Sequence, residues 1–306
     1  MAVTQPIRFL SRHQIDKAKW DRCLSLAENG LLYGYSYYLD HMCKHWSGLV
    51  LNDYESVMPV TWHKKYGIYY LYQPPFCAQL GVFGNHIDAN KMSEFLGNIP
   101  GRFRYWDIYL NPGNPLHETE GSYLRKNFSL RLNLSYESLI NRFSDNIKRN
   151  IRKAVAYGSE SKRNLPLEEV MRFIKKHPHA DSSIRESDFD RFEKLFQFLH
   201  ARGQALSYGI LNGEEKLIAA AIFFFCGQRA YYILAANAQE GKDTGASQLL
   251  MQHFIKDHAG KEMVLDFEGS DHPGLAHFYS SFGAREEQYP CIRRNNLPWY
   301  IRWLKQ

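Results

Sequence analysis

The chain has 306 residues, of which 44% are hydrophobic and 15% aromatic, and it carries a formal net charge of +6 at pH 7. This length allows two domains of about 150 residues each, and the apolar content excludes a largely disordered protein. The modest positive charge is compatible with an anionic partner such as a phosphate, a nucleotide or RNA, and equally with an ordinary, slightly basic protein.

Cysteine usage and hydropathy exclude further classes of protein. The five cysteines are scattered and form no C-x-x-C pair, so we expect neither a disulfide framework nor a metal site. The first residues lack the basic and apolar regions of a signal peptide. The longest apolar run, Leu217–Cys226, has 10 residues, too few to cross a bilayer as a helix. We therefore expect a cytoplasmic protein without a transmembrane segment.

Hydrophobic spacing predicts alternating helices and strands in the first half of the chain. Helices are expected at 15–29, 36–44 and 88–96, and strands at 48–52, 55–62, 67–72, 104–110 and 128–134. A proline-rich loop, residues 73–81, follows the third of these strands. It is either a rigid connector with a packed Phe76 or the lining of an acceptor cleft, in which case Gln79 would contact the substrate.

A basic helix is predicted between the two halves. Ser144 is expected to cap a helix at 146–157 and Gly158 to end it, and Ser135 is a second N-cap candidate. The polar side of this helix carries Lys148, Arg149, Arg152 and Lys153. These cations are either a phosphate clamp for a nucleotide-linked acceptor or a tRNA end, or a solvated helix face. Residues 159–187 are expected to form a charged linker with one helix that starts at Pro166.

The second half has clearer signals. Helices are expected at 188–202, 245–259 and 273–281, and strands at 206–211, 216–225, 229–236, 262–267 and 284–294. Asn212-Gly213 indicates a hairpin because both residues accept positive φ. The strand at 216–225 is apolar on both faces, so we expect it at the centre of a sheet. Residues 237–244 are expected to form a polar loop.

Three landmarks recur in the same order in the two halves. They are a hairpin turn (Asp53 and Asn212), an aromatic strand (68–71 and 230–234) and a strand that bears an aspartate (Asp107 and Asp266). Three matches in order favour a duplicated domain.

With these motifs, the chain resembles the Fem-type peptidyltransferases and their tandem-GNAT relatives, the FemAB-like proteins. The resemblance is carried by residues 148–154, 213–220, 245–246, 266–269, 278 and 282–284. It implies an α+β fold of two tandem GNAT-like acyl-CoA N-acyltransferase domains, at 1–134 and 135–306. Each domain would be a mixed, mostly antiparallel sheet flanked by helices, in which two strands splay apart to receive the thioester arm of the acyl donor.

The resemblance also implies an activity, the transfer of an acyl or aminoacyl group to an amine on a peptide or sugar-nucleotide acceptor. Relatives that build peptidoglycan cross-bridges use aminoacyl-tRNA, and others use acyl-CoA, so either is a possible donor and no tightly bound cofactor is expected. The helical arm of several bridge-forming relatives is missing between residues 159 and 205. A CoA-dependent N-acetyltransferase and a non-catalytic binding protein of the same fold are the alternatives.

The donor site is expected at the start of the helix at 245–259, with Asn237, Lys242, Gly245 and Ala246. Backbone N–H groups at a helix start bind phosphate well. Residues 242–247 nevertheless depart from the Arg/Gln-x-x-Gly-x-Gly/Ala pattern of acyl-CoA users, because Lys stands first and Ser last. Because two domains already supply a cleft, we expect a monomer or a weak dimer.

Acyl transfer to an amine needs a group that accepts a proton and a group that stabilises the developing oxyanion or the leaving group. Glu268 and Asp266 are the candidate bases, since alternation along a strand puts both on one side. The alternative for Asp266 is a structural acceptor for the loop at 269–272. Tyr279 is a candidate donor or a packed aromatic, and Ser270 is a candidate substrate contact.

Overall fold

The computed structural model describes residues 6–117, 121–177, 184–269 and 271–305. The chain forms two compact units: unit 1 consists of residues 1–125 and 288–306, and unit 2 of residues 126–287. The predicted boundary after residue 134 differs from this division. Two strands contain the crossing points, β7 (Ser122–Arg131) and β13 (Arg285–Asn295), so unit 1 is built from both ends of the chain.

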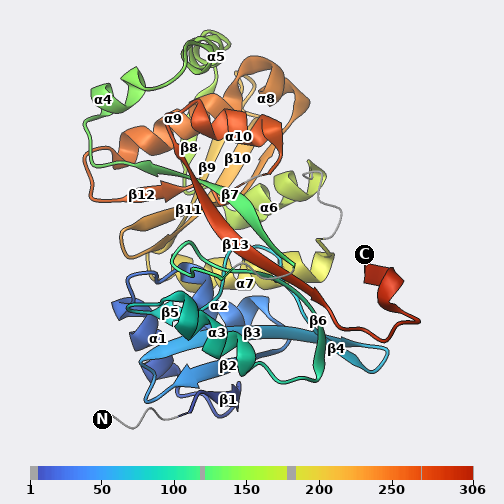
Figure 1. Ribbon diagram of the computed structural model, residues 1–306. Helices are drawn as coiled ribbons and strands as arrows, with labels where there is room; N and C mark the ends of the chain where they lie inside the picture. The colour runs from blue at the N-terminus through green and yellow to red at the C-terminus, as the bar shows by residue number, and fades with distance from the viewer. Residues whose placement is uncertain (1–5, 118–120, 178–183, 270, 306) are drawn as a thin grey trace. The chain divides into compact units, whose positions relative to one another are not determined.

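Unit 1 is a sheet with helices on both faces (Figure 1). Its remaining elements are β1 (Arg8–Ser11), α1 (Lys17–Leu26), η1 (Leu32–Gly34), α2 (Ser36–Met42), β2 (Trp46–Leu51), β3 (Ser56–Lys65), β4 (Ile68–Leu71), β5 (Phe83–Gly84), α3 (Ala89–Gly97), β6 (Phe103–Tyr109) and η2 (Arg302–Lys305). The strand order is β1-β2-β3-β4-β6-β13, and β5 pairs with β3. Only β4 and β6 pair in parallel among these described neighbours.

Helix α1 packs on one face of this sheet and α3 on the other. Trp20 of α1 lies edge-on to Trp46 of β2, with ring centroids 5.4 Å apart. A Cβ atom on Gly48 would lie 2.5 Å from the Trp20 ring, which explains a glycine in the middle of β2. On the opposite face, Met92 and Phe95 of α3 are fully buried. Both faces of the sheet are therefore apolar, as the strand composition requires.

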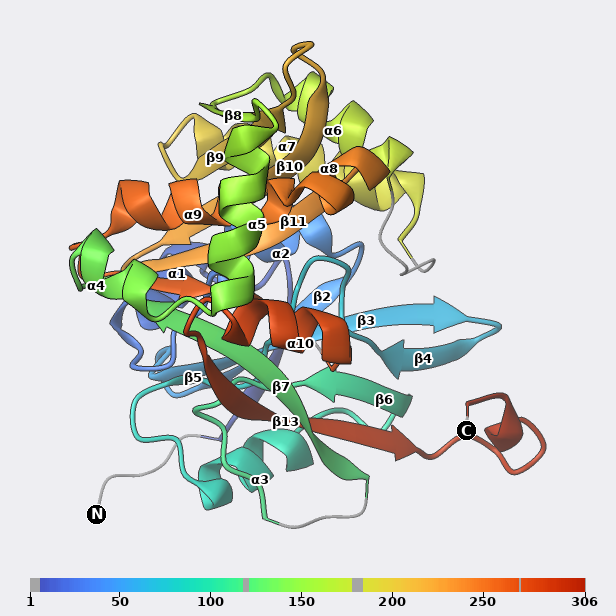
Figure 2. The same ribbon diagram turned by 90° about the horizontal axis from the view of Figure 1, so that it is seen from above.

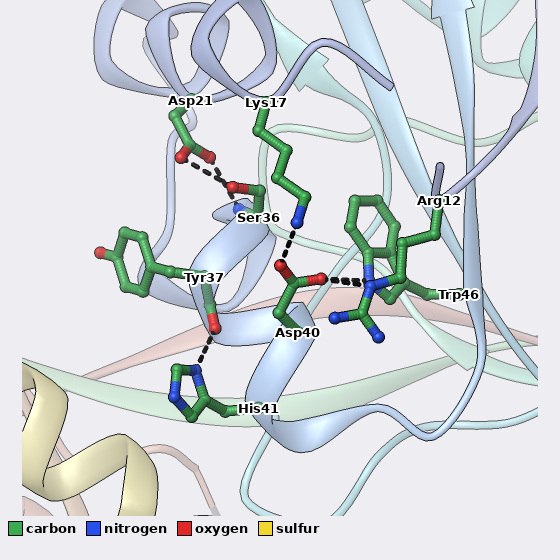
Figure 3. Close-up of polar contacts among 8 residues, drawn as sticks. All are labelled: Arg12, Lys17, Asp21, Ser36, Tyr37, Asp40, His41 and Trp46. Carbon is green, nitrogen blue, oxygen red and sulfur yellow. Dashed lines mark hydrogen bonds and ion pairs between the residues drawn. The ribbon is translucent and has the colours of Figure 1, made fainter. Parts of the chain in front are cut away.

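Asp40 of α2 is the centre of a polar cluster that holds the first helices of unit 1 (Figure 3). Its carboxylate accepts from Lys17 Nζ at 2.6 Å, Arg12 Nε at 2.7 Å and Trp46 Nε1 at 3.0 Å. Nearby, the Asp21 carboxylate accepts from the Ser36 N–H at 2.7 Å, so a side chain of α1 serves the start of α2. Burial of the Asp21 carboxyl raises its pKa.

Unit 2 repeats the arrangement with more helices. Its elements are α4 (Tyr136–Asn141), α5 (Asp145–Ala156), β8 (Glu160–Arg163), α6 (Leu167–Lys176), α7 (Glu186–His200), β9 (Ala205–Leu211), β10 (Leu217–Cys226), β11 (Arg229–Asn237), α8 (Gln239–Thr244), α9 (Ala246–His258), β12 (Val264–Asp266) and α10 (Pro273–Ser280). The strand order is β7-β12-β11-β10-β9-β8, and β11 and β12 are parallel. Each unit is thus a mixed, mostly antiparallel sheet flanked by helices, as predicted.

Strand β10 lies at the centre of unit 2, as its two apolar faces predict. Phe223 stacks on Phe254 of α9 with centroids 3.8 Å apart, whereas Phe224 stacks on Phe192 of α7 at 5.2 Å. Successive side chains of a strand point to opposite faces, so the two phenylalanines bind α9 and α7 to opposite sides of the sheet.

The helix caps were predicted well, and one loop was not. The hydroxyls of Ser135 and Ser144 accept from the first turns of α4 and α5, as expected. The prediction of a polar loop at 237–244 is wrong, because α8 occupies 239–244. Gly241 resembles a helix breaker in the sequence, yet its role is steric: a Cβ atom there would lie 2.3 Å from the Ile218 carbonyl oxygen.

Short edge strands were also missed. β1 and β8 have four residues each and no strong apolar alternation, so their strand structure depends on pairing with β2 and β9. Among the helices that the structure describes, none has the length and apolar character that a bilayer crossing requires.

Substitutions at Gly121 and Gly67 would compare a crowded with an open glycine of unit 1. Both have positive φ, +84° and +81°, but a Cβ atom on Gly121 would lie 2.0 Å from the Arg293 carbonyl oxygen, whereas one on Gly67 would meet nothing within 4 Å. We expect Gly67→Ala to lower the free energy of unfolding by about 1–2 kcal/mol through backbone strain alone. Gly121→Ala should lower it by about 1–3 kcal/mol more because of the clash. Denaturant titration measures both, and equal losses would contradict the close contact.

Candidate active site

The parallel strands β11 and β12 diverge after a short paired stretch. They pair only over residues 229–231 and 264–266 within the described ladder, after which β11 continues to Asn237 and β12 stops at Asp266. Ligands of open α/β sheets commonly bind at the carboxyl ends of such strands. Asp266 ends β12, Glu268 follows it, and Asn237 ends β11, so these three predicted site residues lie at this edge.

Asp266 uses both oxygens of its carboxylate in structural contacts. Oδ2 accepts from Arg229 Nη1 at 2.6 Å, and Oδ1 accepts from the Glu268 N–H at 2.9 Å. The side chain is buried. Burial lowers the pKa of Arg229, but the charge and hydrogen bond of Asp266, together with the nearby Tyr231 and Glu287, raise it more, so the net shift is upward. In unit 1 the matching Asp107 is also paired with an arginine, Arg293, at 3.4 Å. These contacts favour the structural interpretation of Asp266.

Glu268 lies in a tight turn beyond the end of the strand. Its φ is +62° and that of Gly269 is +73°, so the alternation that was expected to align Glu268 with Asp266 does not extend to it. The turn is fixed against β7, because the Phe267 N–H donates to the Phe128 carbonyl at 2.9 Å. A Cβ atom on Gly269 would lie 2.3 Å from the Lys126 carbonyl oxygen. The half-buried Glu268 is thereby held where β11 and β12 part.

Tyr279 of α10 is buried beside this turn. Its ring centroid lies 4.7 Å from that of Phe267 and 6.4 Å from that of Tyr232. Burial raises the pKa of Tyr279 well above its ordinary value, and the charges of Tyr232 and Glu268 raise it further. The phenol therefore keeps its proton at neutral pH.

The start of α9 lies against the basic helix α5 (Figure 2). Gly245, with φ +87°, ends α8 and begins α9, and no side chain caps the first N–H groups of α9 within the described residues. A Cβ atom on Gly245 would lie 2.5 Å from the Asn150 carbonyl oxygen of α5. Ala246 is buried and Lys242 is exposed on α8. Two predicted sites that are far apart in the sequence are thus neighbours.

The cations of α5 face solvent. Arg149, Arg152 and Lys153 are exposed, and Lys148 is half-buried. Arg149 Nη2 donates to Asn146 Oδ1 at 2.8 Å, a neutral partner. Within the described part of the chain, no carboxylate forms an ion pair with any of these four cations. Cations without carboxylate partners beside an uncapped helix start suit a phosphate-bearing ligand.

Two asparagines near the diverging strands have buried polar atoms without partners among the described residues. Asn237 was predicted as a donor-site residue, and Asn127 was not predicted. Asn127 of β7 is buried, and neither polar atom of its side chain has a hydrogen-bond partner among the described residues. Its Cα lies 3.2 Å from where a Cβ atom on Gly269 would be, so it adjoins the Glu268 turn. The Oδ1 atom of Asn237 is likewise buried without a partner. A polar residue just before the segment 128–134, in which apolar and polar residues alternate, was the available signal for Asn127.

The corresponding gap of unit 1 is filled by its own loop. Leu80 bridges to Leu110, and Gln73 Oε1 accepts from the Tyr109 N–H at 3.2 Å. The remaining cavity beside Leu71 and Leu80 has about 10 Å³, room for one water at most. Gln79 is buried in this loop, and its contact with an acceptor stays a prediction.

Two further predictions concern Ser270 and the absence of a metal site. Ser270 lies outside the described residues. Among the residues that are described, no group of three or more His, Cys, Asp or Glu side chains is placed to hold a metal ion.

Comparison with known proteins identifies the fold. A family model described as Acetyltransferase (GNAT) domain matches residues 141–274. No curated protein matches the chain. The crystal structure of FemX matches with a TM-score of 0.65 and 13% identity, covering 95% of this chain and 99% of that one.

Two further solved structures share the fold. A tandem GNAT protein from the clavulanic acid biosynthesis pathway matches with a TM-score of 0.54 and 11% identity, covering 95% of this chain and 99% of that one. L-PGS from Bacillus licheniformis matches with a TM-score of 0.53 and 10% identity, covering 94% of each chain. The chain therefore shares the fold of FemX and of the tandem GNAT protein, with a GNAT domain at 141–274, as the sequence resemblance implied.

The Arg229–Asp266 pair tests the structural role of Asp266. Arg229→Leu leaves a buried carboxylate without its cation, and we expect a loss of about 3 kcal/mol in the free energy of unfolding, the low end of the usual range because Arg229 is partly exposed. Adding Asp266→Asn removes the charge but keeps an acceptor for the Glu268 N–H, so the double variant should recover most of the loss. Urea unfolding measures both. A double variant no more stable than Arg229→Leu would contradict this role.

Proposed function

We propose that this chain is an acyl- or aminoacyltransferase that moves an acyl group to an amine on a peptide or sugar-nucleotide acceptor. One observation supports the proposal: β11 and β12 diverge, with Glu268 just beyond the end of β12, Tyr279 packed on Phe267, and α8 leading from the end of β11 to the start of α9 against α5. The tandem GNAT fold shared with FemX and the GNAT match at 141–274 support it. We place the reaction in the cytoplasm and expect a monomer or weak dimer.

In the proposed reaction, the acceptor amine attacks the acyl carbonyl carbon. A C–N bond forms, and the bond from that carbon to the leaving atom breaks, to sulfur in an acyl-CoA or to a ribose oxygen in an aminoacyl-tRNA. Glu268 accepts the proton that the amine loses, and Tyr279 donates a proton to the leaving atom and later regains one. General acid–base catalysis of this kind typically contributes about 10²–10⁴-fold in rate.

The other residues of the edge would position these groups. Asp266 holds the turn that carries Glu268 by accepting the Glu268 N–H. Asn127, whose buried amide has no partner among the described residues, would gain one from a bound ligand; an unpaired buried polar group costs about 1–3 kcal/mol, which such a contact would offset. Gln79 and Ser270 remain proposed acceptor contacts.

The donor would bind at the start of α9. Its uncapped N–H groups and Gly245 and Ala246 suit a phosphate, and Lys242 and Asn237 flank them. The α5 cations extend the basic surface over residues 148–153, about 7.5 Å of helix. This spread favours a donor with several phosphates, a property that aminoacyl-tRNA and acyl-CoA share, and we take aminoacyl-tRNA as the first candidate because of the fold shared with FemX.

An acetyl-CoA-dependent N-acetyltransferase is the second candidate, because the family model that matches residues 141–274 is that of an acetyltransferase domain. Titration of the protein with acetyl-CoA and with charged tRNA, followed by thermal shift, separates the two donors. A ligand that binds only the folded state raises its stability. If neither donor raises the melting temperature, the non-catalytic alternative gains support.

Glu268→Gln tests the proposed base. The substitution keeps the size of the side chain but removes proton acceptance, so transfer from the bound donor should fall by about 10²–10⁴-fold, with donor affinity and melting temperature unchanged. Single-turnover transfer to a panel of peptide and sugar-nucleotide amines measures this. Glu262→Gln, at an exposed glutamate just before β12, is the matched control. Equal rates for wild type and Glu268→Gln would reject Glu268 as the base.

Arg149→Ala with Arg152→Ala tests the α5 cations. Because both side chains are exposed, folding should be unaffected, whereas donor affinity should fall about tenfold or more, since one charge-assisted hydrogen bond contributes about 1.5–3 kcal/mol. Equilibrium binding of labelled donor measures the loss. Lys194→Ala with Lys261→Ala removes the same charge from exposed positions elsewhere in unit 2. Equal losses in the two double variants would show only a general charge effect.

A further inference from the structure

Unit 1 exposes four large aromatic side chains at one edge of its sheet. Trp299, Tyr300 and Trp303 follow β13 and are 84%, 59% and 65% exposed, and Tyr66 at the tip of the β3–β4 hairpin is 92% exposed. Proteins usually bury aromatic rings of this size, because their burial contributes strongly to stability. A cluster of exposed aromatic residues therefore points to something that covers them.

The strand register places these residues together. Tyr69, near the hairpin tip, pairs with Phe103 at the start of β6, and Asn295, at the end of β13, pairs with Tyr105 on the other side of β6. The hairpin tip and the segment after β13 thus leave the sheet at the same end of β6. Both extend from that side of unit 1 in the two views (Figures 1 and 2).

The same edge is predominantly basic, although Arg293 forms an ion pair with Asp107 at its border. Residues 61–72, 99–106 and 288–306 contain no Asp or Glu. They contain eight cations: Lys64, Lys65, Arg102, Arg104, Arg293, Arg294, Arg302 and Lys305. Lys64, Lys65 and Arg302 are exposed beside the aromatic residues. We call Lys64–Tyr66 together with residues 299–303 the aromatic–basic edge.

We propose that the aromatic–basic edge docks on the surface of an anionic lipid bilayer. Trp and Tyr favour the membrane interface, where the ring is apolar and the N–H or O–H stays hydrated. Each Lys or Arg near an anionic surface contributes about fivefold in binding, equivalent to about 1 kcal/mol. Because the aromatic residues lie on two separate segments, at the tip of a hairpin and after β13, they suit a flat, soft surface better than a strand of nucleic acid. This inference goes beyond the proposed transferase activity.

Vesicle binding of the full chain tests the proposal. We expect the protein to sediment with vesicles of phosphatidylcholine mixed with phosphatidylglycerol, and much less with phosphatidylcholine alone, and high salt should weaken the binding. Trp299→Ser with Trp303→Ser should lower the partition coefficient about tenfold or more. Lys64→Ala with Lys65→Ala should lower it about 25-fold. The control Lys194→Ala with Lys261→Ala, which loses the same charge in unit 2, should bind as the wild type does.

Three results would overturn the proposal. The first is no binding of the wild type to anionic vesicles at low ionic strength. The second is an equal loss in the control and in the edge variants, which would show only general charge attraction. The third is a wild-type protein that self-associates in light scattering and becomes monomeric in the tryptophan variant, which would show that a second copy covers the edge. Melting temperatures of the variants verify folding. The assay contains no donor or acceptor, so its outcome and that of the transfer assay are independent.

Discussion

The short parallel pairing of β11 and β12 is the constraint on which the arrangement of unit 2 depends. Since the ladder ends at Asp266, the chain must turn immediately, and the buried carboxylate of Asp266 holds that turn by accepting the Glu268 N–H while Arg229 balances its charge. The turn places Glu268 directly after Phe267, whose ring packs on that of Tyr279. The same divergence leaves the far end of β11 to lead into α8 and α9, whose start lies against α5.

Unit 1 also contains a diverging parallel strand pair, but a longer segment connects the first of these strands to the next helix. Its parallel pair, β4 and β6, also diverges, but residues 72–88 separate β4 from α3, whereas a single residue, 238, separates β11 from α8. The longer connection turns back into the gap, and Leu80 pairs there with Leu110. One fold thus yields a filled gap in one copy and a cluster of acid–base and basic groups beside the gap in the other.

The sequence predicted most of the fold because most of its signals are local. Ser135 and Ser144 cap the helices that they were expected to cap, and the two apolar faces of β10 indicated its central place. Prediction was poorer where a contact between residues distant in sequence determines the role of a residue. A glycine is required at 241 because the backbone of Ile218 lies against it, and Asp266 has a structural role because it pairs with Arg229. The two ends of unit 1 are joined by pairing between β6 and β13, which local patterns do not record.

The discontinuity of unit 1 has a consequence for biosynthesis. Residues 126–287 form unit 2 as one uninterrupted stretch, whereas unit 1 needs residues 288–306 to add β13 beside β6. During synthesis from the N-terminus, the first unit to begin is therefore the last that can be completed, and until then β6 presents an unpaired edge. Such an edge is a site of mispairing and aggregation in a nascent chain, so the timing of the last strand sets how long β6 is open to wrong partners.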